Sequence, residues 1–155
     1  MATTKRIRLI RCEVDKRLQP NEPIFGQNVI RRQSRKGESV TKNSCVFCKI
    51  VRREVPATII YEDPAVLVFE NIKPIAPVHF LIIPKRHIDS VAAAEDTDQE
   101  ILGKLQLTAR DLGRKLNLES FKLASNSGAA AGQSVFHLHY HLISGQIVPG
   151  GLQSL

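Results

Sequence analysis

The stretch Gln133-Ser-Val-Phe-His-Leu-His-Tyr-His-Leu-Ile143 carries three histidines, each separated from the next by one apolar residue. Strict alternation is the period of a β-strand, so His137, His139 and His141 should project from one face, about 6.5–7 Å apart. Three histidines in register favour a functional site over a surface strand. Two kinds of site remain open at this point, a metal centre or a nucleophilic histidine with helpers. The apolar side chains should point into a core; they are Phe136, Leu138, Tyr140 and Leu142.

The loop before this strand favours the nucleophilic interpretation. Residues 127–134 read Ser-Gly-Ala-Ala-Ala-Gly-Gln-Ser, so a ligand can approach the backbone closely. Exposed amides in such a loop suit a phosphate, and Asn126 and Ser134 add side-chain donors at its ends. A phosphate bound there would lie near the histidine face, where a neutral imidazole is a competent nucleophile toward phosphorus.

Residues 133–143 resemble the signature of the histidine-triad (HIT) superfamily, in which three histidines alternate with apolar residues. A second segment, Phe69-Glu-Asn-Ile-Lys-Pro-Ile-Ala-Pro-Val-His-Phe-Leu-Ile-Ile-Pro-Lys-Arg-His-Ile88, is similar to the central part of the histidine-triad nucleotide-binding (Hint) branch. The resemblance covers roughly residues 45–145. It implies a HIT-like fold and a homodimer with the long helix and a strand at the two-fold axis.

The resemblance also implies roles for the residues of the triad region. His139, the middle histidine, would be the nucleophile, and His141 would donate a hydrogen bond to a phosphate oxygen as charge develops. Ser134 would contact the leaving-group side. Gln133 and Asn126 would bind phosphate oxygens.

A nucleoside pocket is implied in two segments far from the triad. Asn71 stands where the Hint branch carries Asp, so its hydrogen bond to the ribose would lack charge assistance. The diadenosine-polyphosphate-cleaving branch carries Asn at the similar place, and the C-terminal segment lacks the Trp typical of Hint proteins. Without the resemblance, the apolar residues of this pocket would be taken as ordinary core; they are Val46, Phe47, Ile50, Phe69 and Ile72.

Cys45-x-x-Cys48 is a second constellation, and on its own it predicts a zinc site, a redox pair or two buried thiols. A subset of HIT proteins carries this pair and binds structural zinc with the histidine of Pro-Lys-x-His and the first triad histidine. Those positions match His87 and His137. By the same resemblance His137 is the least exposed of the three histidines, and it would support the other two or bind the metal.

The function implied is that of a purine nucleoside phosphoramidase, which cleaves AMP derivatives at the α-phosphate through a nucleotidyl-histidine. One alternative is a dinucleoside polyphosphate hydrolase. Another is a nucleotide-binding interaction protein with incidental turnover.

The pattern of apolar residues and turns predicts an α+β domain, an antiparallel sheet with one long helix and a short N-terminal helix. The strand over 78–83 is almost wholly apolar and should be central, and 121–126 should pair with the triad strand. Thr97 and Glu100 form a capping-box pattern at the start of the long helix. The other expected elements are helices over 45–53 and 98–116 and strands over 58–61 and 65–70.

The net charge of +7 belongs to the N-terminal segment, because residues 1–44 hold 11 Lys/Arg and 4 Asp/Glu while residues 45–155 are balanced. This segment predicts a partly disordered basic extension before a HIT domain over 45–155, with a possible short strand or helix over 6–14. It could also contact polyanions or direct the protein to an organelle. No apolar run reaches a membrane span. Three cysteines without a secretory signal favour a reducing compartment, cytoplasmic or nuclear, with a mitochondrial location also open.

Overall fold

The structure, a computed structural model, describes residues 44–147. The predictions made for the basic extension, including a strand or helix over 6–14, lie outside the described residues. The same holds for most of the C-terminal segment. The described part is the region in which the sequence places every candidate site residue.

Five antiparallel strands form a single sheet in the order β1-β2-β3-β5-β4. The prediction of a central third strand is confirmed, because β3 pairs with β2 on one side and β5 on the other. The pairing of β4 with β5 is confirmed as well. In chain order the strands are β1 Ile59–Glu62, β2 Val66–Glu70, β3 Val78–Pro84, β4 Lys122–Ala124 and β5 Tyr140–Ser144.

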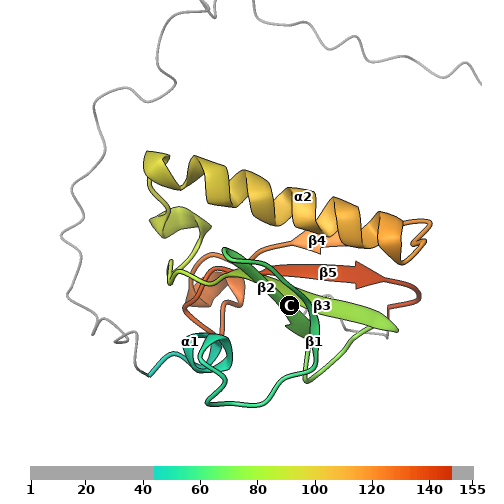
Figure 1. Cartoon of the computed structure of the whole chain (residues 1–155), viewed down its shortest axis with the longest axis horizontal. Coiled ribbons are helices and arrows are strands. Elements are labelled where there is room, and N and C mark those ends of the chain that lie inside the picture. Colours follow the sequence, from blue (N-terminus) through green and yellow to red (C-terminus); the bar gives the residue numbers. More distant parts are fainter. Residues whose placement is uncertain (1–43, 148–155) are drawn as a thin grey trace, which may run out of the picture. The chain divides into compact units, whose positions relative to one another are not determined.

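Two helices cover opposite faces of this sheet (Figure 1). The long helix α2, Gln99–Lys115, covers one face, and the short helix α1, Val46–Val51, covers the other. Strand alternation supplies both cores at once, since successive side chains point to opposite faces. The core under α2 includes Val66, Val68, Ile82, Leu105, Ala109 and Leu142. The core under α1 includes Phe47, Ile50, Leu67, Phe69, Leu81 and Ile83.

The long helix begins one residue later than predicted and its cap lies elsewhere. The capping box expected from Thr97 and Glu100 is wrong; instead, the amide of Glu95 donates to the Asp98 carboxylate at 3.0 Å. A 3-10 turn, Asp96–Asp98, directly precedes the helix, so the capped residue is Glu95, before this turn. The side chain of Arg86 pairs with the same carboxylate.

The triad strand is shorter than its alternation predicts, since β5 begins only at Tyr140. The register pairs Ile82 with Tyr140, so continuing the ladder would set Pro84 opposite Leu138. Proline has no amide hydrogen to donate, and the ladder stops there. Before that point the alternation holds for Leu138, which is buried, but not for Phe136, which is 40% exposed instead of core.

Candidate active site

The three triad histidines lie on the α1 side of the sheet, as the alternation predicted. The ring of Phe47 in α1 meets His139 edge-on, with centroids 5.3 Å apart, and meets His137 at 5.9 Å. The rings of His139 and His141 lie 5.0 Å apart. Exposed fractions are 0% for His137, 5% for His139 and 7% for His141, so the prediction that His137 is the least exposed is confirmed.

His139 is held in the tautomer that a nucleophile needs. Its Nδ1–H donates to the carbonyl oxygen of His137 at 2.7 Å, which leaves the lone pair on Nε2. Burial lowers the pKa of His139 below its ordinary value, because the charged imidazolium is poorly solvated there. The ring therefore stays neutral, with Nε2 able to attack, to a lower pH than a solvated histidine would.

A histidine outside the triad, His79 on β3, contacts His141 directly. The amide of Ile75 donates to Nδ1 of His79 at 3.2 Å, so the neutral ring carries its proton on Nε2. That Nε2 lies 2.8 Å from Nδ1 of His141 and donates to it. Nε2 of His79 also lies 3.0 Å from the side-chain amide nitrogen of Asn71. Both of these nitrogens carry hydrogen and cannot bond to each other, so Nε2–H of His79 donates to His141.

This contact determines the tautomer of His141. With Nδ1 accepting, the proton of the neutral His141 ring is on Nε2, where it can be donated to a ligand. Burial, with the neighbouring rings of His139 and His79, lowers the pKa of His141 to about 3. The sequence reasoning missed His79. Its signal was available, since His79 and Leu81 alternate on the strand predicted to be central.

The phosphate loop uses four of its eight amides within the protein, those of residues 128, 131, 132 and 133, so only part of it can offer amides to a phosphate as predicted. Gly128 and Gly132 adopt positive φ of 92° and 88°, a conformation that glycine tolerates, around the 3-10 turn Ala129–Ala131. Within this turn, amides 131, 132 and 133 donate to the loop's own carbonyl oxygens. The exposed Ser134 and the half-buried Asn126 lie at its two ends, as predicted.

Gln133, expected to bind phosphate, donates all its hydrogen bonds to groups within the protein. Its backbone amide donates to the Gly128 carbonyl at 3.1 Å. Its side-chain Nε2 donates to the carbonyl oxygens of Asp89 at 2.6 Å and Val135 at 3.0 Å, and its Oε1 accepts from the Gly128 amide at 2.8 Å. Gln133 is 3% exposed and all its N–H groups have partners within the protein, so the expected phosphate contact would require one of these bonds to break.

The residues expected around the nucleoside are only partly brought together. Phe47 and Phe69 are buried and meet edge-on with centroids 5.4 Å apart, and Ile50 belongs to the same core. Val46 is 38% exposed and Ile72 is 94% exposed, so Ile72 makes little contact with this core. Asn71 accepts a hydrogen bond from the Lys73 amide through Oδ1 at 2.9 Å, which fixes its amide beside His79.

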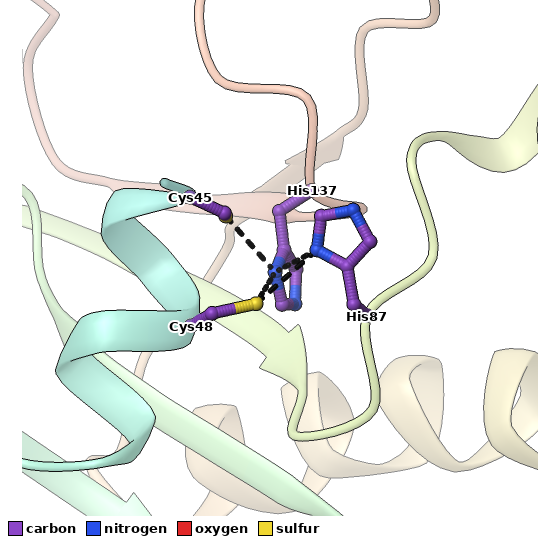
Figure 2. Close-up of side chains that lie close together, drawn as sticks. All are labelled: Cys45, Cys48, His87 and His137. Carbon is purple, nitrogen blue, oxygen red and sulfur yellow. Dashed lines mark hydrogen bonds between the residues drawn. The ribbon is translucent and has the colours of Figure 1, made fainter. Parts of the chain in front are cut away.

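Four side chains expected to bind metal converge beside the triad (Figure 2). Cys45, Cys48, His87 and His137 each place one ligand atom within 4.8 Å of the others. Nδ1 of His137 lies 3.5 Å from each sulfur atom and 3.2 Å from Nδ1 of His87, which is 3.2 Å from Sγ of Cys48. Ligands about 2.0–2.3 Å from a tetrahedral zinc would be separated by roughly 3.3–3.8 Å, so these four separations are close to those of a zinc site and the remaining ones, up to 4.8 Å, would have to shorten around the ion.

The outer hydrogen bonds of the two imidazoles support the same conclusion. Nε2–H of His137 donates to the Pro84 carbonyl at 2.8 Å, and Nε2–H of His87 donates to Asp89 Oδ1 at 2.7 Å. Both Nδ1 atoms therefore carry lone pairs, and these face each other at 3.2 Å. Two such lone pairs can be satisfied by S–H donation from Cys45 and Cys48 or, with the thiols deprotonated, by one cation that all four side chains bind. Outward donation to a carbonyl or carboxylate is typical of metal-binding histidines, so the arrangement is compatible with the metal.

Comparison with known proteins matches the chain to one family. The sequence model of the HIT domain matches residues 52–147. An uncharacterised HIT-like protein of Synechocystis is 45% identical over 102 residues, which are 65% of this chain and 90% of that protein.

Two solved structures are similar. A HIT family hydrolase from Clostridium thermocellum is 47% identical with a TM-score of 0.63, over 66% of this chain and 90% of its own. A hypothetical histidine triad nucleotide-binding protein from Sulfolobus tokodaii is 32% identical with a TM-score of 0.58, over 65% of this chain and 68% of its own. Within residues 44–147 of the present chain, no helix is long and apolar enough to cross a membrane.

Proposed function

The chain belongs to the HIT domain family, and on that premise we propose that it hydrolyses AMP-type purine nucleotide derivatives at the α-phosphate. The observation that supports this most directly is the tautomer of His139, whose Nε2 is left unprotonated beside a second histidine that can donate. The preferred substrate is a nucleoside phosphoramidate. Similarity to a HIT family hydrolase and to a histidine triad nucleotide-binding protein supports the reaction class.

In the proposed reaction, Nε2 of His139 attacks the α-phosphorus while the bond to the leaving group breaks. Ser134 contacts the leaving group, which takes a proton from solvent and departs as an amine; the water that later attacks the intermediate returns a proton to solvent, so the two transfers balance. His141 donates Nε2–H to a phosphate oxygen as charge develops there. Water then attacks the nucleotidyl-histidine, releasing AMP and regenerating neutral His139. Phe47 and Phe69 provide apolar surface for the base close to the nucleophile.

The test of this proposal is detection of the covalent intermediate. Wild-type protein mixed with an AMP phosphoramidate and quenched in acid should carry an adenylyl group on His139, seen by peptide mass spectrometry. His139→Ala should lose the adduct and the turnover but still bind AMP. A His139→Ala variant that turns over at the wild-type rate would show that another residue is the nucleophile.

A second candidate is dinucleoside polyphosphate hydrolysis, because the branch that cleaves diadenosine polyphosphates carries Asn at the place that resembles Asn71. A neutral amide there, fixed beside His79, gives the ribose a weaker partner than a carboxylate would. Comparing rates for an AMP phosphoramidate and diadenosine polyphosphates separates the two. A protein that binds AMP but turns over neither, with no adduct on His139, would be a nucleotide-binding interaction protein.

We also propose that the cluster of Cys45, Cys48, His87 and His137 holds a structural zinc ion. All four ligand positions are taken by protein atoms, so the ion supplies stability rather than a reactive water. His137 would be committed to the metal, while His139 and His141 stay available to the nucleotide. The site would join the start of α1 to the triad segment.

A homodimer is proposed on the exposed apolar surface around α2 and β4. Leu107 is 50% exposed, and Leu116 and Phe121 are each 41% exposed. Phe121 packs closely over α2, where a Cβ at Gly113 would lie 2.7 Å from its ring. Within residues 44–147, β4 is an edge strand and one of its hydrogen-bonding sides has no partner strand. A second copy of the chain would cover these apolar groups.

A further inference from the structure

Pro84, the last residue of β3, and the five residues that follow it hold the triad segment in position. Residues 84–89 follow the ladder where it ends, and three of their carbonyl oxygens accept hydrogen bonds from residues 133–138. These bonds run from His137 Nε2 to Pro84 O, from the Leu138 amide to Ile88 O, and from Gln133 Nε2 to Asp89 O. The nucleophile segment and the phosphate-side loop are thus fixed to the same piece of chain.

Gln133 makes the loop's part of that attachment. Its Oε1 accepts from the amide of Gly128 at the start of the loop, and its Nε2 donates to the carbonyl of Val135 just after the loop. The second Nε2 hydrogen goes to Asp89 at 2.6 Å. One side chain therefore closes the two ends of the loop on each other and joins them to residues 84–89. In the sequence Ser134 lies between Gly128 and Val135, the two loop residues to which the Gln133 side chain bonds.

We propose that Gln133 is a positioning residue, which holds Ser134 at a fixed distance from His139 and does not bind the phosphate. His137 and Leu138 fix the nucleophile segment to residues 84–89, and Gln133 fixes the loop to the same residues. Without Gln133 the loop can shift while His139 stays in place. A displacement of about 1 Å in a reacting group can cost roughly 10²-fold in rate. The rate effect rests on the proposed function, whereas the order of the loop does not.

The experiment compares two substitutions that break the attachment differently. Gln133→Met keeps the shape and removes every side-chain hydrogen bond. Gln133→Glu keeps an acceptor for Gly128 but faces two carbonyl oxygens with a carboxylate. Gln99→Glu, at the exposed first residue of α2, is the matched control for the added charge. Each protein is assayed for kcat and KM with an AMP phosphoramidate, for the Kd of AMP, and for amide hydrogen exchange without nucleotide.

Both Gln133 variants should exchange faster over residues 127–135 and lose roughly 10- to 100-fold in kcat, with the Kd of AMP changed less than about threefold. The control should match the wild type. Unchanged exchange, or faster exchange with an unchanged kcat, would overturn the proposal. So would a Kd for AMP raised more than about tenfold without any change in exchange, which would make Gln133 a phosphate ligand.

Two further outcomes are covered by the design. If Gln133→Glu does not fold, Gln133→Met carries the comparison, because it adds no charge to a buried site. If the wild type does not turn over the phosphoramidate, the proposed substrate fails. In that case, hydrogen exchange over residues 127–135 and the Kd of AMP still show whether Gln133 orders the loop or binds the phosphate.

Discussion

At the residue scale, the proton between His79 and His141 decides what His141 can donate. His79→Phe keeps a buried ring but removes the hydrogen bond to Nδ1 of His141. His141 can then carry its proton on either nitrogen, so only part of the population presents Nε2–H to the phosphate. We expect kcat to fall, by no more than the roughly 10²–10³-fold that loss of an oxyanion donor costs, with KM nearly unchanged. Steady-state kinetics on an AMP phosphoramidate measures this.

The conservative variant His79→Gln is the control for that experiment. A glutamine amide can donate to Nδ1 of His141, so it should recover much of the lost kcat. Equal losses in His79→Phe and His79→Gln, with equal losses of thermal stability, would show that His79 acts only through packing.

The buried imidazoles also give the stability of the fold a defined pH dependence. The pKa of His141 is lowered to about 3 and those of His79 and His139 are lowered too, mainly by burial. Below about pH 6.5 the unfolded chain binds protons at these sites more readily than the folded chain does, so stability falls as the pH falls, and for His141 it goes on falling toward pH 3. Each such histidine contributes a slope of up to about 1.4 kcal/mol per pH unit.

The variant His141→Asn removes one of these groups. Urea unfolding at pH 7.5 and pH 5.0 should show a smaller loss of unfolding free energy for the variant than for the wild type. The same loss in both proteins would mean that His141 is protonated in the folded state as readily as in the unfolded one.

At the scale of elements, α1 is six residues long and depends on what it contacts for its stability. We expect purified protein to contain about one zinc ion per chain. Cys45→Ser should remove most of the metal, as measured by elemental analysis, and should speed hydrogen exchange in α1. Cys12→Ser, which changes the one cysteine outside the Cys45-x-x-Cys48 pair, is the matched control. Metal content equal in wild type and Cys45→Ser would leave both cysteines as plain core residues.

The elements also show what sequence reasoning could and could not reach. Periodic apolar residues predicted α2 to within a residue at each end, and a nearly continuous apolar run predicted the central position of β3. The resemblance brought four distant side chains into one metal cluster, and the structure agrees on their proximity. The length of the triad strand was missed, because it depends on which residue pairs with Pro84, and local alternation carries no information on register.

The hydrogen-bond partners of His79 and Gln133 were missed for a related reason. Each depends on partners far away in the chain, His141 for one and Asp89 for the other. A polar residue type says that hydrogen bonds must be made when it is buried, but not with which group. The resemblance assigned Gln133 to the phosphate, whereas the structure gives its side chain partners at Gly128, Asp89 and Val135.

At the scale of the whole molecule, the exposed apolar surface of α2 predicts the oligomeric state. Leu107→Glu places a charge in the surface proposed to pair with a second copy, so the protein should become a monomer in light scattering after gel filtration. Val91→Glu changes an apolar side chain that is 39% exposed, outside α2 and β4, and should leave the oligomeric state of the wild type intact. A wild type that is already monomeric would contradict the proposed dimer.

The double-sided burial of β2 has a consequence for how the chain folds. Val66 and Val68 face α2, whereas Leu67 and Phe69 face α1. A register slip of one residue would exchange these pairs, placing the Phe69 ring under the long helix and removing it from beside Phe47. Loss of packing in either core alone would destabilise the slipped chain, and here packing is lost in both cores. The correct register of β2 against β3 is thus favoured by packing on both faces of the sheet, and it does not require a bound substrate.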